Sequence, residues 1–110
     1  MTDAKARLRE ARDRLSEADY QVGYFYWRQK WYPGAIVRFK SVLKDDPTYT
    51  GRDGVYFYLA DSLVKVKKEP EALPYLERLV QEFEQSQFLL LTQKKIEELK
   101  AQAPATKPGT

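Results

Sequence analysis

The sequence of 110 residues contains no histidine and no cysteine. These two absences exclude disulfide bonds, thiolate or imidazole metal sites, cysteine nucleophiles and histidine-based catalytic triads. The five glycines are scattered along the chain, so there is no glycine-rich phosphate loop. The paired acidic residues are sequence neighbours, which point about 100° apart on a helix and do not face each other. The sequence therefore predicts no enzymatic activity, no metal ion and no cofactor.

Long hydrophobic runs are also missing. The longest spans residues 55–60, which is far below the roughly 18 residues that a membrane-spanning helix needs. The first residues are charged, and no apolar segment of a signal peptide follows them. Residues 101–110 contain two prolines, one glycine and no large apolar side chain. We expect one domain over residues 1–100 and a disordered tail over residues 101–110.

The remaining sequence has the pattern of an all-α protein. Apolar residues recur at three- and four-residue steps, whereas strict alternation, which is typical of strands, is missing. Pro33 and Pro70 suit the first turn of a helix, where the missing N–H costs nothing. We expect helices over residues 3–30, 33–46, 53–67, from residue 70 onward, and 87–100.

The two halves of the chain repeat with an offset of 37 residues, which aligns Phe39 with Leu76 and Val42 with Leu79. Pairs of helices that recur near every 34 residues are typical of tetratricopeptide arrays, a form of α-solenoid. We predict repeat units over residues 16–49 and 53–86, closed by a capping helix over residues 87–100. Small residues are expected where paired helices cross closely, at Gly23, Ala35, Ala60 and Ala72.

Twelve aromatic residues lie between residues 20 and 58, more than one helix pair can bury. In the repeat register, several of them fall on the first-helix positions that line the concave groove of such arrays. Tyrosine, tryptophan and arginine dominate interface energies, so the groove is predicted to bind a partner. The alternative is that neighbouring helices cover these aromatic residues as core. The predicted partner-binding residues are Tyr20, Tyr24, Trp27, Arg28, Phe57, Tyr58, Asp61 and Lys65.

A family resemblance rests on residues 11–19, ARDRLSEAD, and on a set of later positions: Val22, Phe25, Tyr26, Ala35, Arg38, Phe39, Val42, Leu43 and Pro47. Together they resemble the BamD family, the tetratricopeptide lipoproteins of the outer-membrane β-barrel assembly machinery. The resemblance implies a non-catalytic scaffold on the periplasmic side of the outer membrane. Its partners would be the barrel-assembly channel or unfolded outer-membrane proteins.

The resemblance also implies five repeats and a lipidated N-terminal cysteine. This chain has about two repeats and no cysteine, so we expect a fragment or a short relative, and a cytoplasmic location stays open.

Two other functions stay open. A self-assembling helical module would bury its groove or its solenoid ends against another copy, forming a homo-oligomer. A nucleic-acid binder would use the basic residues 65–68 and the arginines of residues 7–14, but acidic residues interleave with those arginines. With a net charge of only +3, we expect a protein partner and neither nucleic acid nor a small-molecule substrate.

Overall fold

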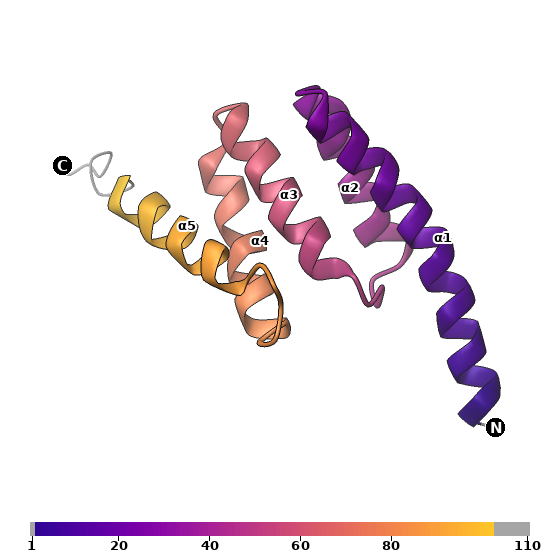
Figure 1. The fold of residues 1–110 in the computed structure, drawn as a ribbon. Helices are drawn as coiled ribbons and strands as arrows, with labels where there is room; N and C mark the ends of the chain where they lie inside the picture. Colours follow the sequence, from indigo (N-terminus) through magenta and orange to yellow (C-terminus); the bar gives the residue numbers. More distant parts are fainter. Residues whose placement is uncertain (1, 103–110) are drawn as a thin grey trace.

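The computed structural model describes residues 2–102, and this part of the chain contains five helices and no strand (Figure 1). The all-α prediction is therefore confirmed. The helices are α1 (Thr2–Arg28), α2 (Tyr32–Asp45), α3 (Arg52–Lys65), α4 (Glu69–Glu82) and α5 (Leu89–Gln102).

Each helix begins within two residues of the expected position, and the four helices with a predicted end also finish within two residues of it. Helix α5 continues to Gln102, so the first two residues of the predicted tail are helical, and residues 103–110 lie outside the described part.

Proline sets the start of two helices, because its fixed backbone angle suits the first turn. Pro33 lies in the first turn of α2, and Pro70 in the first turn of α4. Acidic residues in the first turns of α3 and α4, and basic residues in the last turns of α1, α2 and α3, complement the helix dipole.

Helices α1 and α3 end in the same way. Lys30 and Lys67 have left-handed backbone angles, with φ of 63° and 67°. After α1, the Trp31 N–H donates to the Tyr26 carbonyl at 2.9 Å; after α3, the Lys68 N–H donates to the Leu63 carbonyl at 2.8 Å. This is the Schellman pattern, which ends a helix. The offset of 37 residues that aligns the two halves of the sequence also relates these two turns.

The helices pack in chain order, α1 on α2, α2 on α3, α3 on α4 and α4 on α5, and successive helices run in opposite directions (Figure 1). The molecule is elongated, with extents of 58 × 28 × 21 Å. The N-terminal half of α1 projects beyond the remaining helices (Figure 1).

The expected small residues lie where helices approach closely. Ala35, Ala60 and Ala72 are buried in the core. A Cβ atom added to Gly23 would lie 2.6 Å from the ring of Phe39, which is fully buried. The chain therefore needs glycine at this crossing of α1 and α2.

Polar contacts hold α1 against the segment that follows α2. The buried carboxylate of Asp46 accepts hydrogen bonds from Arg9 and from Ser16, the latter at 2.6 Å. Thr50 donates to Asp13 at 2.6 Å. Burial alone would raise the pKa of Asp46, but the hydrogen bonds from Arg9 and Ser16 outweigh it and lower that pKa below its usual value.

Candidate functional site

One surface carries a continuous set of aromatic contacts between α1, α3 and the turn that precedes α5. Tyr24 and Trp27 stack with ring centroids 5.6 Å apart, and Trp27 lies 4.6 Å from Tyr58. On the other side of Tyr58, Phe57 stacks on Phe88 at 4.8 Å. We call this surface the aromatic face; its members are Tyr20, Tyr24, Trp27, Phe57, Tyr58 and Phe88.

Tyr58 is the centre of the aromatic face, because its ring lies within 6.4 Å of each of the other five. Tyr20, Tyr24 and Trp27 follow each other at steps of four and three residues, so α1 presents them on one side. The arrangement therefore depends on helical spacing within α1 and on the packing of α1 beside α3.

All six rings are half-buried, and Tyr20, Trp27 and Tyr58 also pack against the hydrophobic core. Burial raises the pKa of Tyr20 and of Tyr58, so both hydroxyl groups stay protonated at neutral pH. The rings are thus held rigidly by one another while part of each remains open to a ligand. Rigid, amphipathic rings of this kind bind partners at low entropic cost.

A polar edge borders the aromatic face. The Trp27 indole N–H donates to Asp61 Oδ2 at 2.7 Å, and Lys95 Nζ lies 3.9 Å from Asp61 Oδ1. A shallow depression of about 280 Å³ lies beside this pair. Its lining residues are Trp27, Arg28, Lys30, Tyr32, Asp61 and Lys65.

The eight predicted partner-binding residues thus lie on one continuous surface. Five belong to the aromatic face, and Arg28, Asp61 and Lys65 line the depression together with Trp27. Their role in binding stays a prediction. Phe88 and Lys95 were not predicted as site residues from the sequence; they come from the α4–α5 turn and from α5. An aromatic residue just before the last helix was the only available signal, and helical spacing does not place it against Phe57.

Exposure separates three groups of aromatic residues, and four further rings, those of Tyr26, Tyr32, Tyr75 and Phe83, are half-buried outside the aromatic face. Phe39, Tyr49 and Tyr56 are buried core, and the aromatic face is half-buried. Phe25 and Trp31 are 56% and 54% exposed. Neighbouring helices therefore cover Phe39, Tyr49 and Tyr56 as core. The rings of the aromatic face, Phe25 and Trp31 keep surface that is available for contact.

The arginines considered for nucleic-acid binding are partly engaged within the molecule. Arg9 contacts Asp13 and Asp46, and Arg12 donates to the Asp45 carbonyl at 2.6 Å. These contacts partly neutralise positive charge that could otherwise bind a phosphate backbone.

Within residues 2–102, no helix is both long enough and apolar enough to cross a membrane.

Comparison with known protein families gives a match over the N-terminal half of the chain. The family model YfiO, described as an outer membrane lipoprotein, matches residues 1–58, which is just over half of the chain. The matched range holds α1, α2 and the start of α3, and it includes six of the eight predicted partner-binding residues. No curated protein and no solved structure matches the sequence.

Proposed function

Because the chain belongs to the YfiO family of outer membrane lipoproteins, the BamD-like family that its sequence resembles, we propose that it is a non-catalytic scaffold in outer-membrane protein assembly. It works on the periplasmic side of the outer membrane and binds a protein partner there. That partner is another assembly component or an unfolded outer-membrane protein. The fold that serves this role is a tetratricopeptide-type array of two units, residues 16–49 and 53–86, with α5 as its cap.

The aromatic face carries this proposal. A water-soluble domain gains nothing in its own folding from leaving six large rings half-exposed side by side, and contiguous apolar surface of this kind typically marks a binding site. The rings come from three separate segments that only the fold brings together. A partner helix, strand or peptide that lies across α1 and α3 would cover them.

The polar edge indicates the chemistry of the partner. Arg28, Lys30 and Lys65 surround the depression, and Asp61 is already occupied by Trp27 and Lys95. The open charges at this edge are therefore cationic. A partner segment with aromatic or aliphatic side chains followed by a carboxylate would match both the rings and the edge.

The first test is capture of partners from a bacterial envelope extract, read by mass spectrometry, followed by titration of the purified partner. Trp27→Ala and Tyr24→Ala should weaken binding by about tenfold or more, because hot-spot aromatic residues contribute about 2 kcal/mol or more. Helicity measured by circular dichroism should stay nearly intact. A large loss of thermal stability with unchanged binding would instead assign these two residues to the core.

A charge-reversal pair separates binding from packing. Arg28 and Lys65 are exposed, so the double variant Arg28→Glu, Lys65→Glu should weaken binding of the partner without changing the packing of the core. Lys94→Glu makes the same kind of charge change at an exposed position of α5 and should bind normally. Equal binding by these variants would contradict the proposed role of the cationic edge.

A further inference from the structure

Helix α1 carries a second surface that the aromatic face does not use. Its apolar residues follow each other at alternating steps of four and three, which is the heptad spacing of a helix that packs along another helix. Over the length of the stripe, which spans 21 residue steps, the helix rises about 32 Å. We call this surface the apolar stripe; its members are Ala4, Leu8, Ala11, Leu15, Ala18, Val22 and Phe25.

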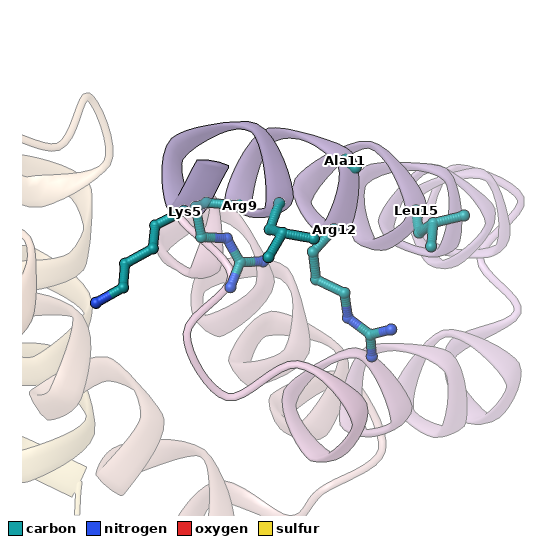
Figure 2. Close-up of a pocket in the computed structure, with 6 residues that line it drawn as sticks. Lys5, Arg9, Ala11, Arg12 and Leu15 are labelled. Atoms are coloured by element: carbon teal, nitrogen blue, oxygen red, sulfur yellow. The ribbon is translucent and has the colours of Figure 1, made fainter. Parts of the chain in front are cut away.

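The apolar stripe is open to solvent. Leu8 is 71% exposed and Leu15 is 63% exposed. A shallow hollow of about 520 Å³ lies along this part of α1, lined by Leu8, Ala11 and Leu15 together with basic side chains (Figure 2). Large exposed leucines at regular helical steps indicate a surface that another element covers.

The second repeat shows what covers the C-terminal part of the equivalent surface. With the offset of 37 residues, Ala18 and Val22 correspond to Val55 and Leu59, which are fully buried, whereas Leu8 and Leu15 correspond to the polar residues Asp45 and Arg52. Helix α3 packs against the preceding helix α2, and Val55 and Leu59 share one core with residues of α2. Within residues 2–102, no helix takes the place of α2 beside the stripe on α1. A helix is therefore the element that this surface accommodates.

The charges that flank the stripe over residues 4–15 have one sign, whereas Asp19 flanks its last part and lies 3.7 Å from Arg38. On α1, Lys5 and Arg12 flank one side of the stripe, and Arg7 and Arg14 flank the other. The acidic residues of the same segment lie away from it: Asp3, Glu10, Asp13 and Glu17. Among the described residues, no ion pair involves Lys5, Arg7 or Arg14, while Arg12 contacts the end of α2. Figure 2 shows Lys5 and Arg12 on this part of α1.

We propose that the apolar stripe binds an amphipathic helix of a protein partner, about three heptads long, whose apolar face is flanked by glutamate or aspartate. The partner helix lies along α1 as α2 lies along α3. Its acidic flanks pair with Lys5, Arg7 and Arg14. This surface is separate from the aromatic face, so one chain presents two binding surfaces.

The charges favour this occupant over two others. A second copy of the chain would bring its own cationic residues 5–14 against the same residues, which repel, and the acidic Asp19 of that copy already pairs with its own Arg38 at 3.7 Å. A membrane surface would favour large apolar residues throughout, whereas every second position of the stripe up to residue 18 is alanine, which lets a partner helix approach closely.

The test uses a synthetic 24-residue helix with leucine on its heptad face and glutamate at the flanking positions, labelled with a fluorophore. A matched peptide has lysine at those flanking positions. Fluorescence anisotropy with the full chain should show binding of the glutamate peptide and about tenfold or more weaker binding of the lysine peptide.

Variants of exposed residues then locate the contact. The double variant Leu8→Glu, Leu15→Glu should weaken binding of the glutamate peptide by about tenfold or more, because two apolar contacts are lost. Arg7→Glu with Arg14→Glu should remove most of the preference for the glutamate peptide, because the cationic Lys5 and Arg12 remain on the other flank. The matched control is Leu90→Glu with Leu91→Glu, two exposed leucines of α5, which should bind as the unchanged chain does.

Four results would overturn the proposal. The first is equal binding of the two peptides, and the second is unchanged binding of the glutamate peptide by the Leu8→Glu, Leu15→Glu variant. The third is a dimer in sedimentation velocity that this variant abolishes, which would assign the stripe to a second copy. The fourth is binding to phosphatidylglycerol vesicles that the variant abolishes while neither peptide binds, which would assign the stripe to lipid.

Discussion

At the scale of single residues, Gly23 and Phe39 mark a close approach of α1 and α2. A methyl group at Gly23 would lie 2.6 and 2.8 Å from two ring carbons of Phe39. Phe39 is fully buried and cannot turn away. We expect Gly23→Ala to lower the free energy of unfolding by about 1–3 kcal/mol, since added volume in a packed core forces neighbours to shift. Chemical denaturation followed by circular dichroism measures this loss.

Gly34 offers a matched control in α2. A methyl group there would lie 2.7 Å from the Trp31 ring, but Trp31 is 54% exposed, so its ring has solvent space into which it can shift. Alanine is favoured over glycine in a helix by roughly 0.5–1 kcal/mol. Gly34→Ala should therefore leave the stability unchanged or raise it. Similar losses in both variants would contradict the assigned role of Gly23.

The sequence predicts some of these residues and misses others, for a physical reason. Gly23 aligns with Ala60 in the repeat, so its position at a helix crossing follows from the pattern alone. Phe88 has no counterpart in the pattern, because its contact with Phe57 depends on the path of the turn between α4 and α5. The core aromatic residues Tyr49 and Tyr56 likewise become distinct from the aromatic face only once the helices are placed.

At the scale of helices, prediction from sequence works well where proline sets the boundary. Pro33 and Pro70 locate the starts of α2 and α4 to within one residue. The end of α1 is less predictable, because lysine instead of glycine takes the left-handed position at residue 30. Lysine favours continuing a helix, so the sequence places this end two residues too late.

Helix α5 closes the open end of the core beside α4. Leu99 is buried there, whereas Leu90, on the same helix, is 79% exposed. We expect Leu99→Ala to lower the free energy of unfolding by about 2–4 kcal/mol through the cavity it leaves. Leu90→Ala should change it by less than about 0.5 kcal/mol, and thermal unfolding of the two variants side by side makes the comparison. Equal effects would mean that α5 does not cap the core.

At the scale of the whole molecule, three carboxylates determine the response to acid. Burial would raise the pKa values of Asp13, Asp46 and Glu82, but hydrogen bonds lower all three below their usual values. Asp13 accepts from Thr50, and Asp46 accepts from Arg9 and Ser16. Glu82 accepts from Arg52 and Tyr56. A carboxylate with a lowered pKa in the folded state contributes stability above its unfolded pKa, and that stability is lost as the pH falls through the folded value.

The melting temperature should therefore decrease once the pH drops below about 4, which is near the pKa of these groups in the unfolded chain. Between about pH 8 and pH 5 it should stay nearly constant, because the chain has no histidine to titrate there. Differential scanning calorimetry across this range measures both parts of the curve. The Asp46→Asn variant should have a lower melting temperature than the unchanged chain at neutral pH. Its melting temperature should decrease by a smaller amount on acidification. A drop between pH 7 and pH 5 would point to groups other than these three.

Helix α1 runs without interruption through 27 residues and carries both the apolar stripe and half of the aromatic face. Adjacent residues of a helix are turned by about 100°, so α1 fixes the angle between the apolar stripe and its own part of the aromatic face, while α3 and the turn before α5 place the rest of that face. An unbroken helix also fixes their separation at about 1.5 Å per residue. With a protein bound at each of the two proposed surfaces, α1 would define how the two proteins are spaced and turned relative to each other.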